Sequence, residues 1–145
     1  MKNFWYLKYK YIPRSYRKVI QETGWESLES IQKVVILEQF HGFSHFFDAS
    51  QFSNSEIIYL ITKQSSLITY FDISKLNDFE IVSILKSRPN LHTYFNLQDL
   101  REYCIADLLN SQPQMLSLFQ DLKITNPYIL DEFPNLRNLL SKQNV

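Results

Sequence analysis

The sequence is poor in glycine and in cysteine. Its 145 residues include 2 Gly and 1 Cys, which is Cys104. Few glycines means few of the left-handed turns that close β-hairpins, so the composition favours helices. A single cysteine excludes an internal disulfide, and nothing therefore points to an oxidising compartment.

Long hydrophobic runs are also missing. No stretch of 18 or more apolar residues occurs, so we expect no membrane span. The N-terminal stretch MKNFWYLKYKYIPRSYRK has no uninterrupted apolar core and no small-residue cleavage site, which argues against a signal peptide. We therefore expect a cytoplasmic protein. Hydrophobic residues make up 45% of the chain and charged residues 21%, which together with the length predicts a single folded domain.

The charge of the chain is unevenly distributed, although the formal net charge is zero. Residues 1–18 contain six basic side chains and no acidic one. Of the 15 basic and 15 acidic residues in total, nine basic and fifteen acidic ones remain for the rest of the chain. A basic, tyrosine-rich segment therefore precedes a mildly acidic body.

The chain repeats itself with a period of 24 residues. Four repeats can be aligned, at 28–51, 52–75, 76–99 and 100–123. Apolar residues recur at the same positions of each repeat, as expected when stacked repeats share a continuous core. The apolar columns are Leu28, Phe52, Leu76 and Leu100; Val34, Ile58, Val82 and Ala106; the pairs Ile36 and Leu37, Leu60 and Ile61, Ile84 and Leu85, Leu108 and Leu109; Phe43, Leu67, Leu91 and Met115; and Phe47, Phe71, Phe95 and Phe119.

The first half of each repeat is predicted to be a short helix. In the third repeat, Ile81, Ile84 and Leu85 have the i, i+3, i+4 spacing of one helical face. Capping-box motifs precede this face in two repeats, because a Ser or Asn is followed three residues later by Glu. These motifs are Ser53 with Glu56 and Asn77 with Glu80.

The second half of each repeat is predicted to be another short helix. Pro89 and Pro113 fall where this helix begins, a position that tolerates the missing N–H of proline. Leu91, Tyr94 and Phe95 follow with helical spacing, so we expect the pairs Tyr70-Phe71 and Tyr94-Phe95 in the core. Helices this short are marginal alone and need stacked neighbours.

The two ends of the chain depart from the period. Residues 1–27 include a helix that ends at Gly24 and are predicted to be an N-terminal cap. In residues 124–145, Pro134 follows Pro113 by 21 positions, which predicts a shortened C-terminal capping repeat. The expected fold is all-α: a short right-handed α-solenoid of stacked two-helix repeats with capping segments at both ends.

The repeat pattern over residues 28–123 resembles that of leucine-rich repeat variant proteins. The positions that carry the resemblance in the clearest repeat are Ile81, Ile84, Leu85, Pro89, Leu91 and Phe95. The resemblance implies alternating α- and short 3₁₀-helices in a curved superhelix. It transfers no catalytic residue, because the matching positions are packing positions.

Few residues suggest chemistry. His41 and His45 are four residues apart, with Asp48 nearby, but Gly42 lies between them and the H-E-x-x-H motif is absent. We expect a helix break with two surface histidines and no metal site. No histidine near Cys104 offers a base, and phosphate-binding and nucleophile-elbow motifs are missing. We therefore expect no catalytic residue, no cofactor and no enzyme activity.

Positions outside the apolar columns vary between repeats and are predicted to face a partner. They include Tyr59, Lys63, Ser83, Lys86, Asp107, His92 and Thr93. Our leading hypothesis is a non-enzymatic protein-binding module that acts as an adaptor or as a stoichiometric inhibitor. A phage-encoded anti-defence factor or an immunity protein fits that description.

The alternative hypothesis is nucleic-acid binding through residues 1–18. Basic residues there are interleaved with aromatic ones, which combines attraction to phosphate with stacking platforms. The residues are Trp5, Tyr6, Lys8, Lys10, Tyr11, Arg14, Arg17 and Lys18. The competing interpretation, which we favour, is a cap whose aromatic rings cover the end of the first repeat. The aliphatic parts of the lysine and arginine side chains would lie over these rings.

Overall fold

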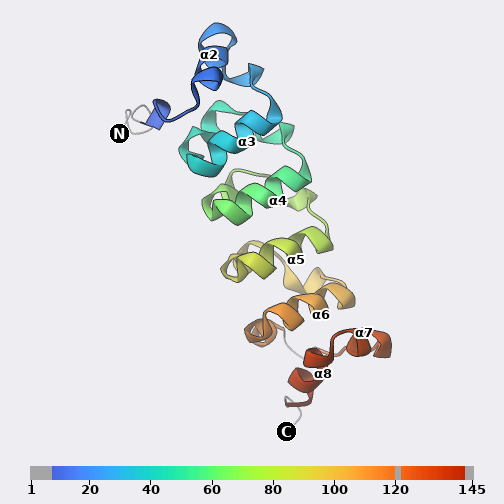
Figure 1. Ribbon diagram of the computed structural model, residues 1–145. Helices are drawn as coiled ribbons and strands as arrows, with labels where there is room; N and C mark the ends of the chain where they lie inside the picture. Colours follow the sequence, from blue (N-terminus) through green and yellow to red (C-terminus); the bar gives the residue numbers. More distant parts are fainter. Residues whose placement is uncertain (1–7, 120–121, 143–145) are drawn as a thin grey trace. The chain divides into compact units, whose positions relative to one another are not determined.

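The computed structural model describes residues 8–119 and 122–142 (Figure 1). Every regular element in these ranges is an α-helix or a 3₁₀-helix, and no β-strand occurs in them. The all-α prediction is therefore confirmed for the described part of the chain. None of its helices combines the length and the hydrophobicity needed to cross a membrane.

The chain divides into two compact units, residues 1–75 (unit 1) and residues 76–145 (unit 2). The boundary coincides with the predicted junction between the second and third repeats. The single-domain organisation stays a prediction.

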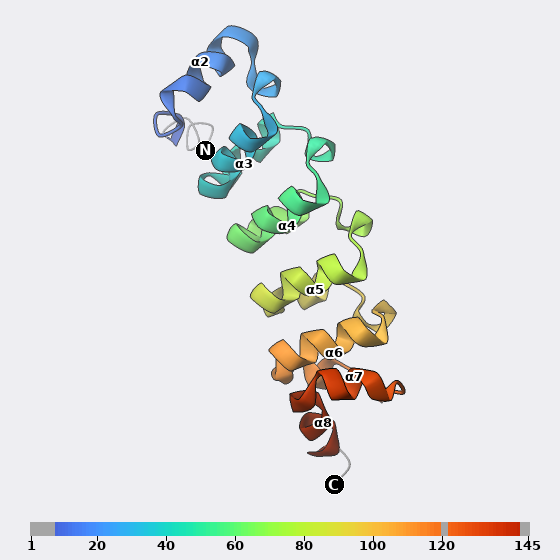
Figure 2. The same ribbon diagram turned by 45° about the vertical axis from the view of Figure 1, so that its right-hand side comes forward.

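Besides the helical residues Lys8 and Tyr9, the described part of unit 1 contains three α-helices, each followed by at least one short 3₁₀ segment. Helices α3 and α4 pack side by side, and each contacts the 3₁₀-helix that follows it (Figures 1 and 2). The elements are α2 (Arg14–Thr23), η1 (Trp25–Ser27), α3 (Ser30–Gln39), η2 (His41–Phe46), η3 (Ala49–Gln51), α4 (Asn54–Lys63), η4 (Ser65–Thr69) and η5 (Ile73–Lys75).

Unit 2 continues the same order of elements and then changes it. Helices α5 and α6 pack side by side, and α6 also contacts α7 and α8. The elements are α5 (Asp78–Ser87), η6 (Pro89–Tyr94), η7 (Leu97–Asp99), α6 (Glu102–Ser111), η8 (Pro113–Leu118), α7 (Pro127–Glu132) and α8 (Pro134–Ser141).

The four ten-residue helices α3 to α6 begin at residues 30, 54, 78 and 102, so their starts follow the 24-residue period. Both predicted capping boxes form, with the Glu56 and Glu80 carboxylates accepting from the backbone N–H groups of Ser53 and Asn77 at 2.9 Å. These bonds satisfy N-terminal groups that a helix leaves without partners. The helix starts were therefore predictable from sequence.

Each of these helices ends at a residue with the same unusual backbone conformation. Phe40, Gln64, Arg88 and Gln112 have φ between −136° and −131° and ψ between 69° and 87°. Proline follows Arg88 and Gln112 and disfavours the helical conformation in the residue before it. At all four residues the chain leaves the α-helix and continues as a 3₁₀-helix.

A third helical element, not expected from the sequence, closes three of the repeats. It is a single 3₁₀ turn, η3, η5 or η7. A side-chain oxygen of Asp48, Asp72 or Asn96 accepts a hydrogen bond from the backbone N–H two residues later. This is the local turn that Asp and Asn favour, and it connects one repeat to the next.

The core consists largely of the predicted apolar columns. The most deeply buried positions are the pairs of adjacent residues in α3 to α6, each at most 2% exposed. They are Ile36 and Leu37, Leu60 and Ile61, Ile84 and Leu85, and Leu108 and Leu109. One prediction was wrong: Tyr94 is 48% exposed and Phe95 is only partly buried, so this pair is not a core pair. By contrast, Phe71 is buried, and Tyr70 is partly buried because its hydroxyl donates to the Phe47 carbonyl at 2.6 Å. Ile58 is also only partly buried.

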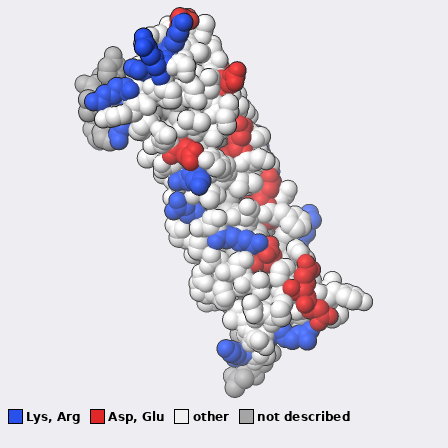
Figure 3. Space-filling model, in the orientation of Figure 1, with Lys and Arg blue, Asp and Glu red and all other residues white. Residues whose placement is uncertain are grey.

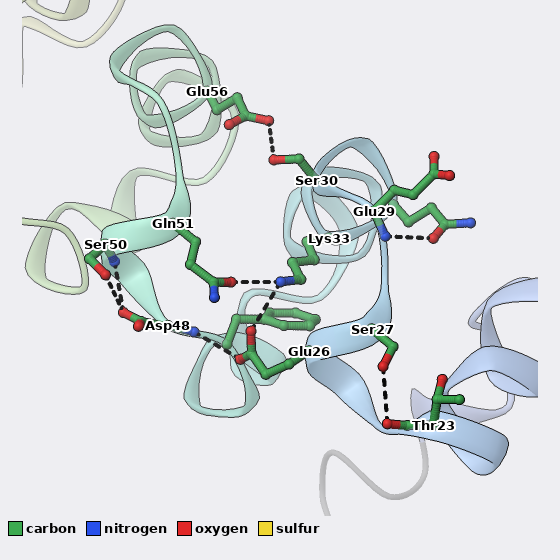
Figure 4. A network of polar contacts seen from close by, with 12 residues as sticks. Thr23, Glu26, Ser27, Glu29, Ser30, Lys33, Asp48, Ser50, Gln51 and Glu56 are labelled. Carbon is green, nitrogen blue, oxygen red and sulfur yellow. Dashed lines mark hydrogen bonds and ion pairs between the residues drawn. The ribbon is translucent and has the colours of Figure 1, made fainter.

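Lys33 is the one buried charged residue among the described residues (Figure 4). Its ammonium group lies 3.1 Å from a Glu26 carboxylate oxygen and donates to Gln51 at 2.7 Å. The other Glu26 oxygen accepts from the backbone N–H of Asp48 at 3.2 Å. The network therefore joins η1, α3 and the segment around η3, and it compensates the buried charge.

The ends of the described chain differ from the central repeats. Helix α2 ends at Gly24, whose φ of 99° is the left-handed conformation that glycine adopts without strain. Helix α7 has six residues, shorter than the ten of α3 to α6, and α8 is an α-helix where the repeats have a 3₁₀-helix. The shortening was predicted, whereas the change of helix type was not. The capping roles of both ends stay predictions.

Candidate interaction surfaces

The predicted partner-binding residues are divided between the two units. In unit 1, Tyr59 and Lys63 lie on α4, and the Lys63 ammonium is 5.7 Å from the centre of the Tyr59 ring. In unit 2, Lys86 on α5 and Asp107 on α6 form an ion pair of 2.7 Å. The remaining residues of this set are Ser83, which is exposed on α5, and His92 and Thr93 on η6.

Unit 1 has a shallow groove between α3 and α4. Its volume is about 290 Å³, and the residues that line it are Ile31, Val34, Val35, Glu38, Ser55, Glu56 and Tyr59. Ile31 is 62% exposed and Tyr59 is 41% exposed, so two large apolar side chains border this groove. Tyr59 was a predicted site residue, whereas Ile31 was missed because its column also contains the polar Ser55.

The described residues that line this groove carry two carboxylates and no Lys or Arg side chain. A hydrogen bond to the Glu38 carboxylate raises the pKa of the Tyr59 phenol. The Glu56 carboxylate accepts from the Ser30 hydroxyl at 2.7 Å, besides closing its capping box. Burial raises the pKa of Glu56, but the hydrogen bonds from Ser53 and Ser30 outweigh it and leave the pKa below its ordinary value. The lowered pKa keeps the Glu56 carboxylate ionised at neutral pH.

Unit 2 presents an aromatic edge that sequence reasoning did not identify. Phe79 is 54% exposed, and its ring centre lies 6.3 Å from that of Tyr103. Tyr103 in turn makes an edge contact with Phe133 at 5.4 Å, and its hydroxyl donates to the Glu132 carboxylate at 2.9 Å. This hydrogen bond raises the pKa of Tyr103. Phe79 and Tyr103 occupy the Ile31 column, so a search for exposed apolar columns would have found them.

The described residues of the basic N-terminal segment pack against Trp25 in η1 and Phe40 at the end of α3. Tyr11 stacks on Phe40 with ring centres 6.3 Å apart, and Lys8 places its ammonium 5.6 Å from the centre of the same Phe40 ring. Tyr9 makes an edge contact with Trp25 at 6.0 Å. Trp5 and Tyr6, which were predicted to contribute, lie outside the described residues.

Helix α2 carries three of the other predicted cations on its surface, and the fourth, Lys10, is exposed before this helix. Arg14 and Lys18 are exposed and Arg17 is partly exposed. An open hollow of about 600 Å³ lies along this helix, lined among the described residues by Arg14, Ser15, Arg17, Lys18 and Gln21. Basic side chains gather at this end of unit 1 (Figure 3). The nucleic-acid role of these residues stays a prediction.

The residues considered for chemistry are divided between the two units, with His41 and His45 in unit 1 and Cys104 in unit 2. Cys104 is 1% exposed, and burial raises the pKa of its thiol, which disfavours the reactive thiolate. His41 and His45 are exposed, and the His45 ring lies against Phe46 at 4.1 Å. The described part of the chain contains no group of three or more His, Cys, Asp or Glu side chains placed to hold a metal ion.

Comparisons with protein-family models, with curated proteins and with solved structures found no match to this chain.

Proposed function

We propose that this chain is a non-enzymatic protein-binding module, built as an α-solenoid of 24-residue repeats with a cap at each end. The regular 24-residue spacing of α3 to α6 supports the repeat architecture. The packing of α3 on α4 within unit 1, and of α5 on α6 within unit 2, supports stacking of adjacent repeats. Repeats that stack in this way present extended surfaces to partners.

The observation that carries the binding proposal is the groove between α3 and α4. Exposed Ile31 and Tyr59 border it, and Val34 and Val35 contribute further apolar lining. Large exposed apolar and tyrosine side chains next to a concavity are the features that anchor protein interfaces. The groove is small, so it accommodates an anchoring side chain and its neighbours rather than a small-molecule substrate.

The charge of the groove indicates the occupant. Because Glu38 and Glu56 line it, the complementary segment carries a basic residue beside one apolar anchor. We assign the groove to such a basic and apolar segment of a partner protein. A chain that binds in this way acts stoichiometrically, as an adaptor or an inhibitor, and a phage anti-defence or immunity-type role belongs to the same proposal.

The predicted partner residues of unit 2 form a second part of this proposal. Lys86 and Asp107 are paired with each other, so a partner that uses them replaces an existing partly exposed ion pair. Such a pair contributes little to affinity, so we expect Ser83, His92 and Thr93 to tune specificity rather than to anchor the partner.

The test is site-specific photo-crosslinking from the groove. A photoreactive phenylalanine analogue replaces Tyr59 in one preparation and Tyr128, which is 80% exposed on α7, in the control. We expect a partner protein to be crosslinked at position 59 and not at position 128. The purified partner should then lose affinity when Ile31→Asp or Tyr59→Ala is introduced, and retain it with Tyr128→Ala. Equal crosslinking at both positions, or a partner that is indifferent to both groove substitutions, contradicts the proposal.

A further inference from the structure

Three cations of helix α2 share one face of that helix. Arg14, Arg17 and Lys18 are related by the i, i+3, i+4 spacing that brings side chains together on a helix surface. With Ser15 and Gln21 they line the open hollow of about 600 Å³. The hollow therefore offers two planar guanidinium groups, one ammonium group and two neutral hydrogen-bonding side chains.

No cation of this face takes part in an ion pair within the described part of the chain. The ion pairs found there involve Lys33, Lys86, Arg101 and Arg137, and none involves a cation of α2. The first turn of α2 contains no acidic residue, so the positive end of the helix dipole adds to the positive charge. Glu22, on the same helix, forms no ion pair with Lys18.

The guanidinium group of Arg17 includes an atom without a hydrogen-bond partner. Its Nε atom is buried and has no hydrogen-bond partner in the structure as described. A buried polar atom without a partner is costly, and a guanidinium group pairs best with a phosphate or a carboxylate through two parallel bonds. The face is thus suited to an anion with several oxygen atoms.

An exposed aromatic ring lies immediately before this helix. Tyr11 is 61% exposed although it stacks on Phe40, and the Lys10 ammonium lies 5.2 Å from the centre of its ring. Tyr11 and Arg14 are three positions apart in the sequence, so their Cα atoms are at most about 11 Å apart. A ring and cations at this separation can contact a base and the phosphates next to it.

We propose that this face binds single-stranded nucleic acid, with backbone phosphates on Arg14, Arg17 and Lys18 and one base stacked on Tyr11. An acidic protein surface would satisfy the cations and leave the Tyr11 ring without a role. A duplex would likewise leave the ring unused, because paired bases are already stacked. The site is separate from the α3–α4 groove, so either assignment can fail without the other.

The experiment is fluorescence anisotropy with a labelled single-stranded oligothymidylate over a salt series. Three phosphate contacts at roughly −0.7 each predict a slope of about −2 for log affinity against log salt. The triple variant Arg14→Gln, Arg17→Gln, Lys18→Gln should lose this binding. The control triple variant Lys75→Gln, Lys123→Gln, Lys142→Gln removes the same charge at exposed positions elsewhere and should retain it.

Two single substitutions provide further tests of the site. Lys18→Glu changes one exposed residue, so it tests the site even where the triple variant fails to fold, as judged by circular dichroism; it should weaken binding far more than Lys75→Glu. Tyr11→Leu should weaken binding, whereas Tyr128→Leu should not. The proposal is overturned by absence of binding, by equal losses in the two triple variants, by a duplex that binds as tightly as the single strand, or by polyglutamate that competes as well as unlabelled oligothymidylate.

Discussion

The side-chain amide of Gln64 donates a hydrogen bond of 2.7 Å to the backbone carbonyl of Glu38. In unit 2, Gln112 makes the same bond, also of 2.7 Å, to the carbonyl of Lys86. Each glutamine follows the last residue of one α-helix, and each carbonyl belongs to the last turn of the helix packed beside it. Because carbonyls of a last turn lack partners within their own helix, these amides tie neighbouring helix ends together.

Substitution of Gln64 should show how much its hydrogen bond to Glu38 contributes to the stability of the protein. Gln64→Met keeps the length of the side chain and removes the donor, so we expect a loss of about 0.5–1.5 kcal/mol in the free energy of unfolding. Gln64→Glu should cost more, because a carboxylate cannot donate to the Glu38 carbonyl and faces the negative end of a helix. Urea unfolding at neutral pH measures both values.

Gln39→Glu is the matched control for the charge change. Gln39 is exposed at the end of α3 and makes no hydrogen bond through its side chain within the described part of the chain. A loss for Gln39→Glu as large as that for Gln64→Glu would show that the charge alone, and not the lost donor, destabilises the protein.

The assignment of inside and outside positions on α5 can be tested with two alanine substitutions. Leu85 is fully buried and Ser83 is exposed on the same helix. Leu85→Ala should reduce the free energy of unfolding by about 2–5 kcal/mol, as is typical of large core truncations. Ser83→Ala should change it by about 0.5 kcal/mol or less. Similar losses for both in chemical denaturation would contradict the assignment.

The buried columns and helix starts were predictable because they depend on local rules and on periodicity. The leucine at position 85 and its equivalents have helical spacing within one repeat, and the Ser53–Glu56 and Asn77–Glu80 motifs are short-range signals. The single 3₁₀ turns have a local signal, because Asp48 and its equivalents are residues that favour such turns. The periodicity of apolar residues contains no information about these turns.

What the sequence could not predict depends on contacts between distant residues. Tyr70 is held by the carbonyl of Phe47, whereas the equivalent Tyr94 makes no hydrogen bond among the described residues and remains exposed. The α3–α4 groove needs Ile31 of one repeat beside Tyr59 of the next. Neither pairing has a signature within a single repeat, so only the packed structure reveals it.

Lys33 shows how a polar residue can occupy an apolar column, and this leads to a further prediction. Its equivalents in the other repeats are Ile57, Ile81 and Ile105. Lys33→Met should leave stability within about 1 kcal/mol of the original or increase it, because replacing a buried ion by an apolar side chain is often neutral or stabilising. Glu26→Ala should cost more, about 1–3 kcal/mol, because it leaves the buried ammonium with Gln51 as its remaining hydrogen-bond partner.

The comparison by chemical denaturation is informative because Glu26 is half-exposed and stays hydrated when Lys33 is replaced. If Lys33→Met proves more destabilising than Glu26→Ala, the ion pair contributes net stability, and the view that it merely compensates a buried charge is incorrect.

The hydroxyl of Tyr70 should have a measurable effect on stability and on its pH dependence. Burial, together with the nearby carboxylates of Asp48 and Glu26, raises the pKa of Tyr70 from 10.0 to about 12. Since the folded state favours the neutral phenol, its contribution is fully present below pH 10 and is lost as the pH rises through about 12. Tyr70→Phe should therefore cost about 0.5–1.5 kcal/mol at neutral pH, and this difference from the original protein should shrink above pH 10.

Tyr94→Phe, at an exposed position, should change stability by about 0.5 kcal/mol or less throughout. Urea unfolding across the pH series measures the stabilities. Because the pKa values of Tyr59 and Tyr103 are raised as well, an ultraviolet titration should show several late-ionising phenols, of which the one with a pKa of about 12 is lost in Tyr70→Phe and retained in Tyr94→Phe. A phenol that still ionises with a pKa of about 12 in Tyr70→Phe would mean that the hydrogen bond to Phe47 does not hold this side chain as described.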